Sequence, residues 1–161
     1  MSIGKLIFSQ DLVYFFNGKV SKTEAISILI SLLEKKGYVK PSFKQAVLDR
    51  EEVFPTGLPT QPVAVAIPHT DSLHVNQSAL AVGILKKPVS FIEMGTTDTK
   101  LSVSVISILA ISDKNSMVEV LRHFALVFRD QDFIKKISGC VSAQEALDLY
   151  THTMRNLILV Q

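Results

Sequence analysis

The pattern of apolar and polar positions predicts strands and helices that alternate along the chain. Continuous apolar runs at residues 64–67 and 79–85 predict buried strands, and a longer run at 101–111 predicts the central strand of a sheet. Apolar and aromatic residues at 6–16 predict one or two further strands. The segment 88–91 begins with proline and predicts a short edge strand, where a missing backbone N–H is tolerated.

Helix starts are marked by a serine followed three residues later by glutamate or glutamine, the pattern of a capping box. Such patterns begin at Ser21, Ser42, Ser116 and Ser142. The first predicted helix ends at Gly37, the second near Val53 and the third near residue 128. A shorter helix is predicted over 132–137, and the proline-rich segment 54–59 predicts a constrained loop. Interleaved strands and helices favour the α/β class, with a sheet covered on both faces.

Composition narrows the class of protein. With 161 residues, 47% of them hydrophobic, the chain is expected to form a single domain over residues 1–161. The net charge of +2 and the scattered lysine pairs argue against nucleic acid as a partner. No apolar run reaches membrane-spanning length and no signal-peptide pattern is present, so we expect a cytoplasmic protein without direct membrane insertion. The single cysteine, Cys140, fits a reducing compartment and is expected to be a small buried hydrophobic residue.

Candidate chemistry begins where the predicted strand at 64–67 ends. Pro68 fixes the backbone at the strand exit and His69 follows at once, so we expect its imidazole to be held rigidly. An imidazole near its own pKa suits proton transfer, metal binding or attack on an electrophile. The alternative is an ordinary polar residue in a surface turn.

Arg50 interrupts an apolar helical stripe that includes Phe43, Ala46, Val47 and Phe54. A guanidinium on this side of a helix either lines an anion site, where its planar fork suits phosphate, or reaches water and pairs with one of the two glutamates that follow it. Periodicity leaves both interpretations open.

Several other chemistries lack their sequence signatures. A metal site built from His69, Asp71 and His74 has an unusual ligand spacing, and no cysteine lies near it. A nucleophile elbow, a Walker loop and a Gly-x-Gly-x-x-Gly loop are all absent from the sequence, so a nucleotide held by such a loop is not expected. His123, with Glu119 one turn before it, is expected to be a solvated helix residue.

Arg50, the loop 54–57 (Phe-Pro-Thr-Gly) and the motif 66–69 (Ala-Ile-Pro-His) occur in an order that resembles the IIA component of the bacterial sugar phosphotransferase system (PTS). The resemblance is to the type-2, mannitol/fructose superfamily and extends over most of the chain. Within it, segments 50–57 and 68–74 are most similar to galactitol-type IIA proteins.

The resemblance implies one α/β domain with a mixed central sheet flanked by helices on both faces. It also implies a phosphotransferase that acts as a phosphocarrier, needs no cofactor or metal, and serves uptake of a sugar or polyol such as galactitol. His69 would accept a phosphoryl group from HPr and pass it to a cysteine of a IIB component, which feeds a membrane IIC transporter. Arg50 takes the position of the family's phosphate-stabilising arginine.

One position departs from the family pattern. Mannitol-type members carry a second active-site histidine where this chain has residues 115–117 without a histidine. Thr70 and His74 are therefore the candidates to stabilise phosphate in its place. An exposed apolar rim around His69 is expected for docking of protein partners, with Leu58, Leu73 and Val75 as its candidates.

Two alternative functions remain at this point. The first is a regulatory IIA-like module that is phosphorylated, or senses phosphorylation, without feeding a transporter; such modules usually lie in longer chains, so a chain of this length favours the carrier. The second is a small metal-dependent hydrolase that uses His69, Asp71 and His74.

Overall fold

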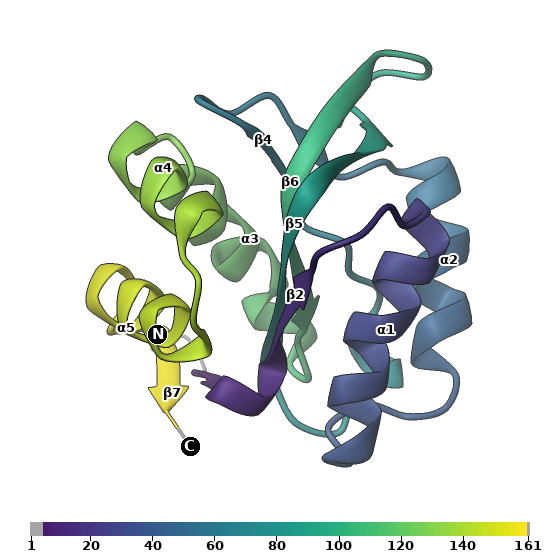
Figure 1. Ribbon diagram of the computed structural model, residues 1–161. Helices are drawn as coiled ribbons and strands as arrows, with labels where there is room; N and C mark the ends of the chain where they lie inside the picture. Colours follow the sequence, from purple (N-terminus) through teal and green to yellow (C-terminus); the bar gives the residue numbers. More distant parts are fainter. Residues whose placement is uncertain (1–4, 161) are drawn as a thin grey trace.

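A mixed β-sheet separates two layers of helices in the computed structural model, which describes residues 5–160 (Figure 1). The sheet order is β3-β4-β6-β5-β1-β7, and β2 also pairs with β5. The strands are β1 (Leu6–Phe8), β2 (Val13–Phe16), β3 (Gly57–Leu58), β4 (Ala64–Ala66), β5 (Ala79–Ile92), β6 (Lys100–Ala110) and β7 (Ile158–Val160). This arrangement confirms the predicted α/β class with a mixed sheet.

The predicted central strand is confirmed as β6. It pairs with β5 in an antiparallel hairpin, from Ala79 opposite Ala110 to Ile92 opposite Lys100, and with β4 in parallel on its other side. The predicted separate strand at 88–91 is wrong, because this segment continues β5 after an irregularity in the register between residues 84 and 89. Its proline is tolerated because a bulge removes the need for a regular ladder bond there.

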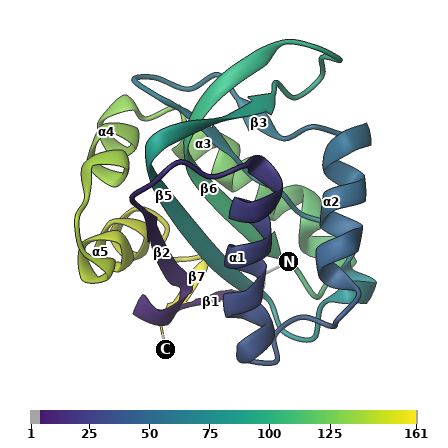
Figure 2. The same ribbon diagram turned by 45° about the vertical axis from the view of Figure 1, so that its right-hand side comes forward.

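Helices cover both faces of the sheet (Figure 1, Figure 2). One layer holds α1 (Lys22–Lys35) and α2 (Phe43–Val53), and the other holds α3 (Met117–Val127), α4 (Gln131–Gly139) and α5 (Ala143–Thr153). Helix α1 buries its apolar stripe fully against β5. At its end, Gly37 adopts the left-handed conformation, with φ of 73°, as predicted for a helix stop. Within residues 5–160, no helix combines the length and the apolar character needed to cross a membrane.

Two of the predicted capping boxes are confirmed and two are wrong. Ser21 and Ser142 each accept a hydrogen bond from the backbone N–H three residues later, at 3.1 and 3.2 Å. Ser42 and Ser116 have helical backbone angles and make no such bond. A short 3₁₀ turn at Lys114–Ser116 precedes α3, and Asp113 caps that turn instead. A carboxylate one turn earlier thus displaces the serine from the capping position.

Two short strands were not predicted. β3 lies inside the segment predicted as a loop, and it pairs antiparallel with β4. β7 follows α5 and pairs in parallel with β1 at the opposite edge of the sheet. Strands of two or three residues are too short to show a period in the sequence, so only their pairing partners define them.

Candidate functional site

His69 follows β4 after Ile67 and Pro68, where the chain leaves that strand. The chain stays attached to β6 beyond β4, because the N–H of Leu109 donates to the carbonyl of Pro68 at 3.1 Å and His69 itself bridges to Leu109. The residue is 7% exposed. The expected rigid placement of the imidazole is therefore present, and His69 is not an ordinary residue of a surface turn.

One hydrogen bond defines the state of the His69 ring. Nδ1 lies 2.7 Å from the carbonyl oxygen of Ile67. A carbonyl only accepts, so Nδ1 must carry the proton and the lone pair of the neutral ring lies on Nε2. Burial lowers the pKa of His69 and the charge of Arg50 lowers it further, while the bond to Ile67 and the charge of Asp71 oppose them. The neutral, nucleophilic form is thereby favoured at neutral pH.

Arg50, in the last turn of α2, supplies a positive charge close to His69. Its guanidinium carbon lies 5.1 Å from the centre of the Phe54 ring, and its Nη1 lies 4.0 Å from Oδ1 of Asp71. Its Nε is buried and has no hydrogen-bond partner among residues 5–160. The side chain is 36% exposed, so the guanidinium reaches water as one interpretation expected, and the same exposure leaves room for an oxyanion beside it.

The charged neighbours of Arg50 differ from those expected. Neither glutamate that follows it is its ion-pair partner: Glu51 is 4% exposed and accepts from Thr56, whereas Glu52 lies near Lys22. Asp71 pairs with Arg50 and was considered only as a metal ligand. This contact depends on how α2 packs beside the segment after β4, which no local pattern in the sequence indicates.

Thr70 and His74 lie on the segment that follows His69. Thr70 is 5% exposed, and His74 ends a 3₁₀ turn at Ser72–His74. Nδ1 of His74 lies 2.7 Å from Oγ of Ser42, which ties this turn to the start of α2. Their phosphate-stabilising role stays a prediction.

Two of the three side chains predicted for the docking rim are at least partly exposed, and the third is buried. Leu73 is 63% exposed and Leu58 is half-buried, but Val75 is only 6% exposed and belongs to the core. Val75 was wrongly placed on the rim because it forms a β-bridge with Val39, which turns it inward. Phe54, 60% exposed and stacked on Arg50, was missed.

The sequence of the chain matches the family described as "Phosphoenolpyruvate-dependent sugar phosphotransferase system, EIIA 2" over residues 6–152. The chain belongs to this family. It is therefore a phosphotransferase protein with a phosphocarrier role in a sugar PTS, as the resemblance in the sequence implied.

Named relatives of this EIIA protein differ in specificity. The galactitol-specific EIIA component of Escherichia coli K12 is 28% identical over 103 residues, covering 64% of this chain and 68% of the relative. The ascorbate-specific EIIA component of the same strain is 30% identical over 132 residues, covering 81% and 82%. Among solved structures, enzyme IIAMTL from E. coli, in its complex with phosphorylated enzyme IIBMTL, has a TM-score of 0.75 at 23% identity, covering 91% and 99%.

The metal-ligand candidates of this EIIA protein do not form a cluster. Asp71 faces Arg50 and His74 faces Ser42, as their contacts show. Nowhere in the described part of the chain do three His, Cys, Asp or Glu side chains gather in a way that could hold a metal ion. His123 is exposed on α3, as expected.

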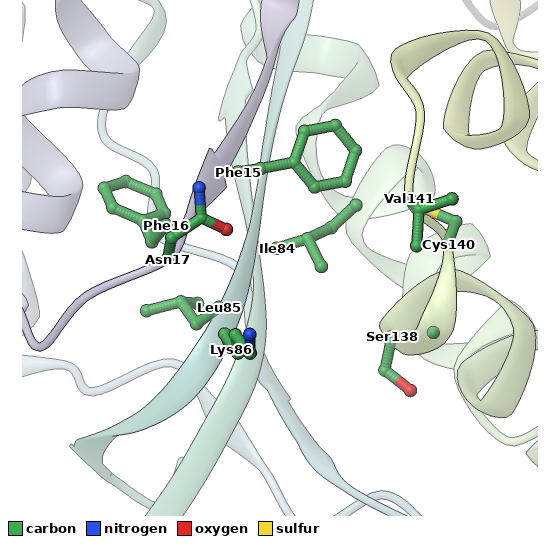
Figure 3. A pocket seen from close by; sticks show the side chains of 10 residues that line it. Phe15, Phe16, Asn17, Ile84, Leu85, Lys86, Ser138, Cys140 and Val141 are labelled. Atoms are coloured by element: carbon green, nitrogen blue, oxygen red, sulfur yellow. The ribbon is translucent and has the colours of Figure 1, made fainter.

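A separate pocket of about 440 Å³ lies between the end of β2, the middle of β5 and the turn between α4 and α5 (Figure 3). Phe15, Ile84 and Val141 give it apolar walls, and Cys140 lines it with 5% of its surface exposed. Burial raises the pKa of the Cys140 thiol to about 11. The expectation of a buried, hydrophobic cysteine is confirmed.

Proposed function

We propose that this EIIA protein accepts a phosphoryl group on Nε2 of His69 from the phosphohistidine of HPr and passes it to a cysteine of a IIB component. The observation that carries the proposal is the Nδ1–Ile67 hydrogen bond, because it leaves the lone pair of the neutral ring on Nε2. In the first step Nε2 attacks phosphorus and the nitrogen–phosphorus bond in HPr breaks. In the second step a IIB thiolate attacks phosphorus and Nε2 recovers its lone pair.

Charge stabilisation is assigned mainly to Arg50. Phosphoryl transfer passes through a loose transition state with negative charge on the equatorial oxygens. Hydrogen-bond donors fixed beside these oxygens therefore contribute most of the rate acceleration by the protein. The half-buried guanidinium of Arg50 carries such donors. We assign secondary roles to Thr70, next to His69, and to His74, whose Nδ1 is bound by Ser42 while Nε2 has no partner among the described residues.

Docking of the two protein partners is assigned to the surface around Arg50. Phe54 stacks on Arg50, and Leu73 and the half-buried Leu58 are the further apolar side chains assigned to this surface. The solved complex of enzyme IIAMTL with phosphorylated enzyme IIBMTL shows a protein of this fold engaging a IIB partner. That precedent supports a IIB partner here, with the membrane IIC transporter reached only through IIB.

We propose galactitol as the transported polyol. The support is the match of segments 50–57 and 68–74 to the galactitol type and the 28% identity to the galactitol-specific component. Ascorbate is the second candidate, because the ascorbate-specific component is 30% identical over a larger share of the chain. Transfer from the phosphorylated protein to the galactitol IIB, measured beside transfer to the ascorbate IIB, separates the two.

Intact-mass measurement tests the phosphocarrier step. After incubation with phosphoenolpyruvate, enzyme I and HPr, the protein should gain one acid-labile phosphoryl group, and His69→Ala should gain none. No gain, with HPr itself shown to be phosphorylated, would contradict the proposal.

A regulatory role is the outcome if His69 is phosphorylated but no IIB accepts the group. The fold alone does not decide between transport and regulation, since the Nitrogen Regulatory Protein IIA-Ntr of Neisseria meningitidis shares this fold with a TM-score of 0.69 at 23% identity.

A further inference from the structure

Glu51 is a buried carboxylate without a direct ion-pair partner among the described residues. It lies in the last turn of α2 between Arg50 and the exposed Glu52, and only 4% of its surface is exposed. Burial raises its pKa, against the effect of the hydrogen bonds that it accepts. The charge of Lys22 lowers the pKa of Glu51, but Lys22 forms its 3.8 Å ion pair with Glu52 instead. A carboxylate is costly to bury, so its contacts need an explanation.

Both oxygens of Glu51 are used on a single residue. The backbone N–H of Thr56 donates to Oε2 at 2.8 Å, and the Thr56 hydroxyl donates to Oε1, also at 2.8 Å. Thr56 is itself 2% exposed. The pair closes the turn that leads from α2 into β3, with two hydrogen bonds that involve a charged acceptor and therefore have defined geometry.

Thr56 continues this chain of contacts to the nucleophile. Its carbonyl accepts from the N–H of Ile67 at 3.3 Å, and the carbonyl of Ile67 accepts from Nδ1 of His69 at 2.7 Å. The next residue, Gly57, pairs with Ala66 of β4. Glu51 thus connects the end of α2, which carries Arg50, to the strand exit that orients His69.

We propose that Glu51 is a positioning residue for phosphoryl transfer: its two hydrogen bonds to Thr56 fix the end of α2 that carries Arg50 relative to the β3–β4 segment that orients His69. The proposal rests on the proposed function, since it assigns Glu51 to the same site. Glu51 touches neither the phosphoryl group nor His69, and it acts only through Thr56 and Ile67. A displacement of about 1 Å of Arg50 relative to His69 can lower the rate of phosphoryl transfer by about 100-fold.

The chemistry of Thr56 allows a sharp set of variants. Glu51→Gln can keep both bonds, because the amide oxygen accepts from the backbone N–H and the threonine hydroxyl can accept from the amide NH₂. Glu51→Ala removes both bonds, and Thr56→Val removes only the hydroxyl bond. Glu52→Ala is the control for a carboxylate in the same turn. Tyr150→Phe is the control for stability, because it removes a buried hydrogen bond between Tyr150 of α5 and Ser107 of β6, outside α2 and the β3–β4 segment.

Two measurements decide the proposal, both made at a temperature where circular dichroism shows each variant folded. The first is the rate of phosphoryl transfer from phospho-HPr, which should fall by about 10- to 100-fold in Glu51→Ala and less in Thr56→Val. Glu51→Gln and both controls should stay within about threefold of the wild type. The second is nitrogen-15 NMR of the His69 ring, where Glu51→Ala should lose the single Nδ1-protonated tautomer and show a pKa closer to the ordinary 6.5.

A folded Glu51→Ala with a wild-type rate and ring tautomer would overturn the proposal, as would an equal loss in Glu51→Gln or in Tyr150→Phe. If Glu51→Ala does not fold, Thr56→Val decides alone: an unchanged rate and tautomer overturn the proposal, and a joint change supports it. The ring measurement needs no phosphoryl donor. It therefore still tests the placement of His69 by Glu51 if the wild type accepts no phosphoryl group, the result that would contradict the proposed function itself.

Discussion

His69 and Cys140 are both nucleophilic residue types that the fold buries, to 7% and 5% exposure, and burial has opposite consequences for them. Desolvation disfavours the charged form of either group. Desolvation lowers the pKa of His69, and the nucleophilic form of an imidazole is the neutral one. Desolvation raises the pKa of Cys140 to about 11, and the nucleophilic form of a thiol is its anion. The same burial therefore favours the neutral imidazole of His69 and the neutral thiol of Cys140 at neutral pH.

Their surroundings separate the two residues further. The His69 ring is oriented by the carbonyl of Ile67 and lies near the charge of Arg50, which together select one nitrogen and one protonation state. Cys140 lines a largely apolar pocket, and the nearby Glu145 carboxylate adds to the rise of its pKa. A buried nucleophile becomes a functional site only where its partners favour the reactive form.

The largest effect is expected from removing the cation beside His69. Arg50→Ala should slow phosphoryl transfer from phospho-HPr by about 100- to 1000-fold, because a preorganised donor to the transferring phosphoryl group is lost. Rapid-quench measurement of phosphoprotein formation gives this rate. Arg50→Lys keeps the charge but not the planar fork, so it should recover only part of the rate.

The Cys140 pocket provides the matched control for this prediction. Cys140→Ser changes a buried nucleophile outside the site and should leave transfer within about twofold of the wild type. A rate for Arg50→Ala as close to the wild type as that of Cys140→Ser would contradict the assigned role of Arg50.

The thiol itself gives the second prediction. A rise of the Cys140 pKa from 9.0 to about 11 leaves about 100-fold less thiolate at neutral pH. Iodoacetamide should therefore alkylate the native protein about 100-fold more slowly than the denatured protein at the same pH, as followed by intact mass. Equal rates in the two states would show that burial does not control this thiol.

The sequence allowed His69 and Arg50 to be found but not their partners. His69 follows a strand and a proline without interruption, and Arg50 interrupts a helical stripe, so both signals are local. The pairing of Arg50 with Asp71 depends on how α2 packs beside the segment after β4, and no local period reports that contact. Glu51 was missed as a buried residue because its partner Thr56 lies beyond the end of its own helix.

The difference between local signals and tertiary contacts also explains the errors in the predicted secondary structure. Ser21 and Ser142 cap their helices as predicted, whereas Ser42 is bound to His74 from a distant turn. A tertiary contact thus replaces the local hydrogen bond that the capping pattern indicates. Likewise β7 is defined only by its pairing with β1.

Two glycines, one near the Glu51–Thr56 pair and one beside the Cys140 pocket, should differ in their effect on stability when each is replaced by alanine. A Cβ on Gly57, next to Thr56, would lie 2.6 Å from the backbone oxygen of Ile92, so Gly57→Ala should reduce the free energy of unfolding by about 1–3 kcal/mol. A Cβ on Gly139, beside the Cys140 pocket, would meet nothing within 4 Å. Gly139→Ala should therefore stabilise the protein by about 0.4–1 kcal/mol, since it restricts the unfolded chain. Urea unfolding of both variants measures the difference, and a loss of stability in Gly139→Ala equal to that in Gly57→Ala would contradict it.

The smallest expected effect is the pH response of His69. Because the pKa of His69 lies below 6.5 in the folded protein, more than half of the molecules still carry a neutral ring at pH 6.5. The rate of phosphoryl transfer to His69 should therefore fall by less than about twofold between pH 7.5 and 6.5. The unfolded chain, with the higher pKa, binds the proton first. The contribution of His69 to stability is therefore fully present above about pH 6.5 and is lost as the pH falls towards the folded pKa.

NMR titration of the His69 ring measures this pKa directly, and His69→Gln should remove the corresponding part of the pH dependence of unfolding. Arg50→Ala should raise the His69 pKa, since it removes a positive charge that opposes protonation. A wild-type pKa at or above 6.5 would contradict the comparison with Cys140, because burial would then not favour the nucleophilic form of His69.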